Sequence, residues 1–436
     1  MKPVKVGLLG LGTVGGGTIN LLQRNRDEIS RRAGRDIEIV HAAARHLDRP
    51  RTCSTEGIRL TTDPFEVVED PETDIIVELI GGETLAKDLT LRAIELGKHV
   101  VTANKALIAA SGNEIFERAR EQGVSIAFEA AVAGGIPVIK AIREGLVGNH
   151  IEWLAGIING TANFILSEMF YADREFGDVL AEAQRLGYAE ADPTFDVEGV
   201  DAAHKLTILA SIAFGIPLQY EKVHVEGISH VGQEDVAYAD ELGFRIKHLG
   251  IASRTETGIA LRVHPTLLPK RQLLASVDGV MNAIMIHGDA LGPTLYYGPG
   301  AGAEPTASAV VADLVDVVRE FTLAPEDRVP YLAFHSHALS NDPVVPMDRV
   351  ETAYYLRMQA LDRPGVLAEV ARLLGASGIS IEAIIQKQPA PGAEDVPVII
   401  LTHRVEEMQM NQACEAIEAM EAIRGQVHRI RVETLE

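Results

Sequence analysis

The run Gly10-Leu11-Gly12-Thr13-Val14-Gly15 follows an apolar stretch at residues 4–9 and opens a segment with helical spacing at residues 13–32. Glycine permits a tight turn between a strand and a helix. It also lets backbone N–H groups approach a pyrophosphate at the helix N-terminus. Because the pattern lies in a complete strand–turn–helix setting, it indicates a dinucleotide-binding turn and not only a tight connection.

Strand and helix patterns alternate behind this turn. The strand-like runs are residues 37–44, 74–80, 99–102 and 124–128, and the helical runs between them include residues 85–96 and 113–122. Such alternation predicts an α/β fold with a parallel sheet wound on both faces by helices. We therefore expect a Rossmann-type nucleotide domain at residues 1–133, completed by residues 303–323.

The rest of the chain divides into three parts. In residues 134–302 the regular alternation of strands and helices ends, and we expect an α+β catalytic and dimerisation domain there. Residues 324–349 are rich in Pro, Asp and His and indicate a linker. Residues 350–436 show the order βαββαβ of a ferredoxin-like domain. Within it we expect a helix that begins at Pro364, a hairpin strand that ends at Gln388, a second helix at residues 406–423 and a last strand at residues 427–433.

Charge and composition exclude some classes of protein. The formal net charge is −22, which repels nucleic acid and anionic membranes, so neither is expected as a partner. No run of eighteen apolar residues suggests a membrane span. The only cysteines, Cys53 and Cys414, are far apart in the sequence, so a disulfide framework is not expected and a reducing cytoplasm fits.

The end of the second expected strand bears on which cofactor binds. NAD enzymes usually place an acid there, whereas this chain has Ala43-Ala44-Arg45-His46. An arginine can pair with a 2′-phosphate, so NADP(H) is favoured over NAD(H). Asp48 lies close and keeps NAD(H) open, and a merely solvated Arg45 is the alternative.

A second informative run extends from Gly187 to Lys205 and holds five acids and a lysine beside an apolar helix. Asp201 and Lys205 are four residues apart and share one face of that helix. Asp201 and Lys205 could form a surface ion pair, or the acids could bind Mg²⁺. Because the rest of the helix is apolar, we expect Lys205 to lie near the core or in a cleft. Lys105 follows the strand at residues 99–102, and residues at the carboxyl ends of parallel strands border the ligand crevice.

Taken together with Glu78-Leu79-Ile80-Gly81-Gly82 and residues 158–166, these runs closely resemble homoserine dehydrogenases over residues 1–320. The resemblance implies NAD(P)-dependent interconversion of L-aspartate 4-semialdehyde and L-homoserine. It implies that Lys205 is the acid/base and that Lys105 is its cleft partner and a cofactor contact. It further implies that Gly81 and Gly302 contact the cofactor and that Gly187, Glu190 and Asp201 hold the substrate.

The resemblance also implies a structural monovalent cation, Na⁺ or K⁺. It would lie on Glu129 and on the backbone of Val132, Gly134 and Ile136, which offer hard oxygen ligands in a glycine-containing loop.

The stretch at residues 361–370 resembles the ligand loop of ACT domains, which bind small amino acids at interfaces between domains. Asp362, Gly365 and Val366 are the expected effector contacts. The biosynthetic pathway suggests threonine as the effector, and the domain type suggests a homo-oligomer, a dimer or a tetramer.

Three other functions compete with this interpretation. An aspartate-semialdehyde dehydrogenase needs a nucleophilic cysteine, and neither Cys53 nor Cys414 is suitably placed. A 2-hydroxy-acid dehydrogenase with an ACT tail should show a histidine-centred acid/base pair. A non-catalytic nucleotide and amino acid sensor would not need the pair of lysines.

Overall fold

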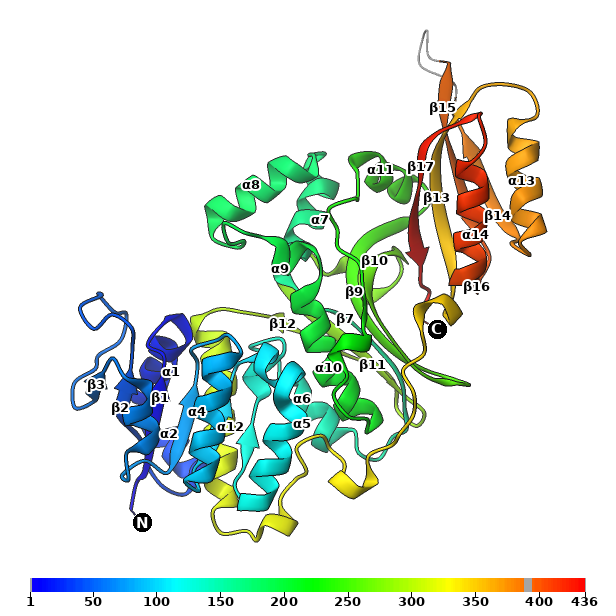
Figure 1. Cartoon of the computed structure of the whole chain (residues 1–436). Coiled ribbons are helices and arrows are strands. Elements are labelled where there is room, and N and C mark those ends of the chain that lie inside the picture. Colours follow the sequence, from blue (N-terminus) through cyan, green and yellow to red (C-terminus); the bar gives the residue numbers. More distant parts are fainter. Residues whose placement is uncertain (1, 388–393, 436) are drawn as a thin grey trace. The chain divides into compact units, whose positions relative to one another are not determined.

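The computed structural model describes residues 2–387 and 394–435 (Figure 1). They form two compact units. The first comprises Met1–Gly160, Asp201–Val223 and Val280–Asp342, and the second comprises Thr161–Val200, His224–Gly279 and Pro343–Glu436.

A six-stranded parallel sheet forms the centre of the first unit, in the order β3-β2-β1-β4-β5-β6. The strands are β1 (Val4–Leu9), β2 (Ile37–Ala43), β3 (Arg59–Thr61), β4 (Ile75–Glu78), β5 (His99–Thr102) and β6 (Ile126–Ala127). The order reverses between β1 and β4, which is the switch point where doubly wound sheets bind dinucleotides. The predicted nucleotide-binding fold is confirmed, although the short strand β3 was not expected.

Two layers of helices cover this sheet (Figure 1). They are α1 (Thr13–Arg24), α2 (Arg26–Ala33) and α12 (Ala303–Glu320) on one side and α3 (Pro64–Glu69), α4 (Thr84–Glu95) and α5 (Lys105–Gln122) on the other. Helix α12 brings Val310 and Leu314 into the core beside Ile19 and Leu8, as the predicted return of the chain requires. The single helix expected at residues 13–32 is wrong, because Asn25 ends α1 and begins α2.

The first unit also holds an antiparallel group of strands, β7 (Ile151–Ile157), β11 (Met281–Gly288) and β12 (Gly292–Pro299). The short helix α6 (Val138–Lys140) and a π-helical turn (Ala141–Gly145) precede β7. Helix α10 (Val200–Phe214) contributes the buried residues Leu206, Ile208 and Leu209, which fits the apolar pattern of that segment.

The second unit combines helices with a mixed sheet. Its helices are α7 (Gly160–Ala172), α8 (Phe176–Leu186), α9 (Thr194–Val197), α11 (Gln233–Glu241), α13 (Val366–Ala376) and α14 (Glu407–Glu418). Its strands are β8 (His224–Val225), β9 (Phe244–Thr255), β10 (Gly258–Pro269), β13 (Glu351–Leu361), β14 (Ile381–Gln386), β15 (Asp395–Thr402), β16 (Val405–Glu406) and β17 (Ile423–Val432).

The C-terminal segment has the predicted ferredoxin-like order, with strands arranged β17-β13-β15-β14. Three expected boundaries are wrong. Helix α13 begins at Val366 and not at Pro364, because Gly365 takes a left-handed conformation with φ +93. Helix α14 ends at Glu418, and β17 begins at Ile423, which had been assigned to the helix. The expected strand end at Gln388 lies outside the described residues.

Strand β17 pairs in parallel with β10, so the C-terminal domain continues a sheet of the second unit. Arg431 on β17 is 2% exposed and holds Glu226 through both terminal nitrogens at 2.8 Å and Glu407 at 2.6 Å. Arg357 on β13, 9% exposed, binds Asp235 at 2.6 Å. Removing one partner of such a buried pair costs about 3–5 kcal/mol, because the other charge is left uncompensated.

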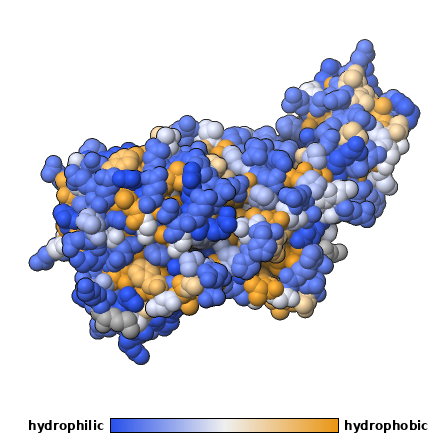
Figure 2. All heavy atoms as spheres, turned by 60° about the horizontal axis from the view of Figure 1, so that its bottom comes forward, coloured by the Kyte–Doolittle hydropathy of each residue, from blue (hydrophilic) through white to orange (hydrophobic). Residues whose placement is uncertain are grey.

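Among the described residues, no helix is both long enough and apolar enough to span a membrane. Figure 2 shows hydrophilic residues over most of one face, with separate apolar patches between them.

Candidate active site

The glycine-rich turn joins β1 to α1 at the carboxyl edge of the parallel sheet. Gly10 has φ +102, and a Cβ on Gly15 would lie 2.1 Å from the carbonyl oxygen of Gly10, so neither position accepts another residue without strain. Gly12 caps the helix, and a Cβ built there meets nothing within 4 Å. The N-terminus of α1 is therefore open to an anion.

A loop at the end of β4 borders the same edge and is fixed by Glu78. The buried carboxylate of Glu78 accepts hydrogen bonds from the backbone of Ile80 and Gly81 and from the hydroxyl of Thr102. This network holds Gly81, an expected cofactor contact, at the end of its strand.

Lys105 lies at the first position of α5, three residues after Thr102, where β5 ends. Asn104 caps the helix by accepting from the backbone N–H of Leu107 at 3.1 Å, and its amide donates to the carbonyl of Gly82 at 2.6 Å. The cap therefore fixes the start of α5, and with it Lys105, against the Gly82 loop.

The two predicted catalytic lysines meet at Asp201. Lys205 donates to Asp201 Oδ2 and to the carbonyl oxygen of Ile158, both at 2.7 Å, and Lys105 Nζ lies 3.1 Å from Asp201 Oδ1. Asn159 donates to Asp201 Oδ2 at 2.9 Å. The i,i+4 spacing of Asp201 and Lys205 thus places both on one face of α10. The catalytic roles of the two lysines stay predictions.

Burial alone would raise the pKa of Asp201, but the ammonium groups of Lys205 and Lys105 outweigh it and hold this pKa well below its usual range. The carboxylate is therefore ionised at any pH at which the enzyme would be assayed. The Lys205 side chain is 12% exposed and that of Lys105 is 33% exposed, whereas Asp201 is 5% exposed.

His204 lies beside Lys205 in sequence and was not expected to matter. Its ring packs on Tyr220 with centroids 4.3 Å apart. Burial lowers the pKa of His204 to about 4, so the imidazole is neutral near pH 7. The only sequence signal for it was its place in the 187–205 run.

The structure shows the surroundings of Arg45, the residue expected to contact the 2′-phosphate. Arg45 is exposed beyond the end of β2. Arg51, which sequence reasoning missed, donates to the carbonyl oxygens of Leu11 at 2.9 Å and His46 at 2.8 Å. It therefore ties the loop after β2 to the glycine-rich turn, and no motif signalled it.

The expected cation ligands lie on the chain from Glu129 to Ile136, and Glu129 is 4% exposed. Its carboxylate accepts the backbone N–H groups of Ile139 at 2.9 Å and Lys140 at 2.7 Å. Burial raises the pKa of Glu129 to about 7. Among the described residues, no group of three or more His, Cys, Asp or Glu side chains forms a metal-binding cluster.

The remaining predicted contact residues lie at the ends of several different helices. Gly302 caps α12 with φ +126. Gly187 caps α8, and Glu190 is exposed after it; both lie in the second unit, so their approach to the lysines stays a prediction. Asp362 and Gly365 flank Pro364 before α13, and the amide of Asp362 donates to the carbonyl of Glu394 at 3.0 Å.

A phosphate-binding turn at the switch point of a doubly wound sheet, with a lysine–carboxylate–lysine group in the same unit, defines the class of nicotinamide-dependent dehydrogenases. Family models match three segments: the NAD binding domain of homoserine dehydrogenase at residues 10–129, homoserine dehydrogenase at 137–315 and the ACT domain at 354–422. The chain belongs to the homoserine dehydrogenase family.

Full-length relatives support this assignment. The chain is 66% identical to the homoserine dehydrogenase of Pseudomonas aeruginosa and 52% identical to that of Neisseria gonorrhoeae, in both cases over 100% of each chain. A crystal structure of a homoserine dehydrogenase from Thiobacillus denitrificans aligns with TM-score 0.95 and 62% identity, covering 100% of this chain and 99% of the other. The 2-hydroxy-acid dehydrogenase and the non-catalytic sensor are therefore not supported.

The Asp201 geometry leads to a first prediction. Asp201→Asn keeps the shape but removes the charge that both lysines share, so Lys105 and Lys205 should move apart. We expect kcat to fall roughly tenfold or more, the effect of losing one charge-assisted interaction in the transition state. Steady-state rates of the folded variant measure this. Glu221→Gln, which removes an exposed charge in the same unit, is the control, and a wild-type kcat for Asp201→Asn would contradict the assignment.

Proposed function

We propose that the enzyme interconverts L-aspartate 4-semialdehyde and L-homoserine with a nicotinamide cofactor. The observation that carries the proposal is the buried Asp201 carboxylate, which holds two lysines within 3.1 Å. The names of the relatives support the same reaction.

The nicotinamide, when bound, supplies or accepts the hydride. The protein's own task is to move a proton at the substrate oxygen and to keep the reacting carbon in place. Lys205 is the acid/base, because its ammonium group is held between Asp201 and the Ile158 carbonyl. Lys105 lies on the other oxygen of Asp201 and stabilises negative charge on the substrate oxygen.

Asp201 orients the lysines more than it holds substrate. Its oxygens already accept Lys205, Lys105 and Asn159, so little capacity remains for the substrate ammonium group. That group therefore falls to the exposed carboxylate of Glu190, with Gly187 shaping the turn before it.

Lys205→Ala tests this assignment. We expect kcat with aspartate semialdehyde to fall about a hundredfold or more, the usual contribution of a general acid–base group. The measurement is the initial rate with NADPH and with NADH, after circular dichroism has shown that the variant is folded. Lys222→Ala, at an exposed lysine of the same unit, should behave like wild type. Turnover at the wild-type rate would remove Lys205 from the mechanism.

We also propose that NADP(H) is the preferred cofactor. Arg45 is exposed just after β2, where dinucleotide-binding folds carry the residue that contacts the ribose, and Arg51 ties this loop to the glycine-rich turn. A hyperthermophilic archaeal homoserine dehydrogenase in complex with NADPH aligns with TM-score 0.61 and 27% identity, covering 73% of this chain.

Arg45→Ala should raise KM for NADPH about tenfold, the loss of one charge-assisted contact, and leave KM for NADH nearly unchanged. Arg49→Ala, in the same exposed loop, is the control. An equal increase for both cofactors would show that Arg45 does not discriminate between them.

A structural Na⁺ or K⁺ is proposed beside Glu129. The Glu129 carboxylate is occupied by backbone N–H groups, and the carbonyl of Ile136 accepts from Val138 at 2.8 Å. The carbonyl oxygens of Val132 and Gly134 are therefore the better ligands. Hard oxygen ligands suit these ions, and Glu129 would balance the charge from close by.

The C-terminal domain is proposed to sense threonine at an interface between copies of the chain, which requires at least a dimer. The loop from Asp362 to Val366 leads into α13, whose N-terminus favours a carboxylate, and Asp362 can meet an ammonium group. Inhibition requires that threonine bind one conformation better than another.

Gly365→Ala should weaken threonine inhibition about tenfold or more without changing the uninhibited rate. With φ +93 at this position, an alanine would distort the loop that meets the ligand. Inhibition curves at millimolar threonine measure it, and Glu382→Ala, an exposed acid on β14, is the control. If the wild-type chain ignores threonine, the domain serves another ligand or only assembly.

A further inference from the structure

The two oxygens of the buried Glu78 carboxylate bind different segments at the carboxyl edge of the parallel sheet. Oε1 accepts the backbone N–H groups of Ile80 at 2.9 Å and Gly81 at 3.2 Å, whereas Oε2 accepts the hydroxyl of Thr102 at 2.7 Å. Glu78 and Thr102 are both 0% exposed. A buried carboxylate is costly unless its oxygens are hydrogen-bonded, so each of these contacts helps to hold its segment in place.

Thr102 and Asn104 carry this network into the first turn of α5. The Thr102 hydroxyl accepts the backbone N–H of Asn104 at 3.0 Å, and the Asn104 side-chain oxygen caps the helix. The Asn104 amide nitrogen donates to the carbonyl oxygen of Gly82 at 2.6 Å, back in the loop that Glu78 holds. The side chains of Glu78, Thr102 and Asn104 thus close a ring of hydrogen bonds, the Glu78 ring, between the loop at residues 80–82 and the start of α5.

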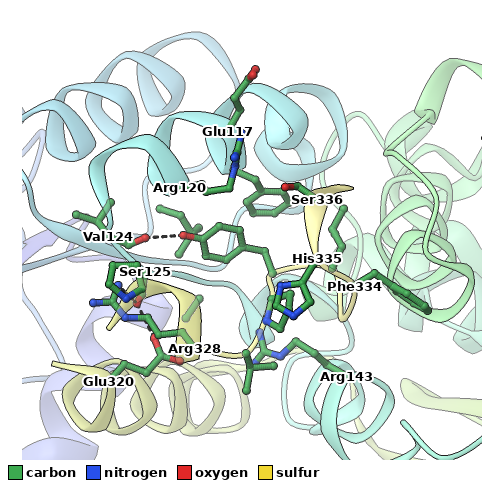
Figure 3. Close-up of a pocket in the computed structure, with 18 of the residues that line it drawn as sticks. Glu117, Arg120, Val124, Ser125, Arg143, Glu320, Arg328, Phe334, His335 and Ser336 are labelled. Atoms are coloured by element: carbon green, nitrogen blue, oxygen red, sulfur yellow. Dashed lines mark hydrogen bonds between the residues drawn. The ribbon is translucent and has the colours of Figure 1, made fainter. Parts of the chain in front are cut away.

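The rest of α5 is held by contacts that do not involve the Glu78 ring. The Asn113 amide donates to the carbonyl oxygen of Leu218 at 3.0 Å and accepts its backbone N–H at 3.1 Å. Phe116 stacks on Tyr331 with ring centroids 5.1 Å apart, and the Tyr331 hydroxyl donates to the carbonyl oxygen of Val124 just beyond the helix (Figure 3). Loss of the ring should therefore displace the first turn of α5 and leave the remainder of the helix in place.

Lys105 extends from that first turn. Its ammonium group lies 3.1 Å from Asp201 Oδ1, and its side chain is 33% exposed. A lysine stem is flexible, so the backbone position from which it extends decides whether the ammonium group meets Asp201 or moves toward solvent. A displacement of about 1 Å in a group at the reacting centre can lower the rate about a hundredfold.

We propose that Glu78 and Thr102 are positioning residues, which through the Glu78 ring hold the Lys105 ammonium group at its place in the site. The inference rests on the proposed function, in which Lys105 stabilises negative charge on the substrate oxygen. Neither positioning residue needs to touch substrate or cofactor, because both act through the chain that they hold. Since the two oxygens of Glu78 bind different segments, loss of the Oε2 contact should affect Lys105 and leave the loop at Gly81 in place.

Thr102→Val tests the proposal, because valine has nearly the shape of threonine but no hydroxyl. The backbone N–H of Asn104 then loses its acceptor, whereas Glu78 Oε1 still holds the loop after β4. We expect kcat with aspartate semialdehyde to fall between about tenfold and a hundredfold, with KM for NADPH nearly unchanged. Thr102→Ser keeps the hydroxyl and should keep kcat close to wild type, whereas a role in packing alone predicts the larger loss for serine, which lacks the methyl group. Asn104→Ser keeps a capping oxygen but opens the ring at Gly82, and should lower kcat roughly tenfold.

Steady-state rates of each variant are measured after circular dichroism has shown that it is folded. Thr90→Val is the matched control and should keep the wild-type kcat, because Thr90 is 2% exposed on α4 and its hydroxyl has no hydrogen-bond partner among the described residues. In Lys105→Ala, adding Thr102→Val should cause no further loss, since the effects of residues that act through one group are not additive. Wild-type kcat in Thr102→Val or Asn104→Ser, equal losses in Thr102→Val and Thr102→Ser, or a further loss in the double variant would overturn the proposal. A wild-type rate in Lys105→Ala would instead contradict the proposed role of Lys105, and with it this inference.

Discussion

The arrangement of Lys105 and Lys205 depends on one interaction, the pairing of both ammonium groups with the buried Asp201 carboxylate. A buried charge is tolerated only when it is paired and hydrogen-bonded, and Asp201 meets this condition with two lysines and the Asn159 amide. Its three partners come from α10, from the start of α5 and from the residues after β7. The Asp201 carboxylate therefore links these three parts of the first unit through charge and hydrogen bonds.

The start of α5 shows how the parallel sheet serves this requirement. Glu78 at the end of β4 accepts the hydroxyl of Thr102 at the end of β5, and that hydroxyl in turn accepts the backbone N–H of Asn104. Asn104 caps α5 and so sets the position of Lys105. A chain of hydrogen bonds along the carboxyl edge of the sheet thus connects the loop at Gly81 with the lysine that faces Asp201.

The sequence predicted those parts of the molecule that local patterns encode. The glycine-rich turn, the strand–helix alternation and the i,i+4 spacing of Asp201 and Lys205 are local, and each is found in the structure. No local pattern indicated three other features. The contacts of Arg51 and the hydrogen bond from Asn159 to Asp201 join segments that are far apart in the sequence. The end of α1 at Asn25 depends on the backbone conformation of that residue. Pro364 predicted the first turn of α13, because proline is common at that position. The helix begins later, at Val366, because Gly365 has a left-handed backbone conformation.

The C-terminal domain cannot be an independent appendage of the second unit. Arg431 holds Glu226, and two residues later the backbone of Ile228 donates to the carbonyl of Val197 at 2.8 Å. Val197 ends α9, three residues before Val200 begins α10, the helix that carries Asp201 and Lys205. A change at β17 therefore reaches, through an ion pair and a hydrogen bond within the second unit, the chain that leads into α10. For such a path to regulate the enzyme, the effector must favour one of two arrangements of these contacts, because a ligand with equal affinity for both shifts nothing. Burial of Arg431 makes intermediate arrangements costly, since a partly separated pair would leave charge unpaired, and this favours discrete states over gradual ones.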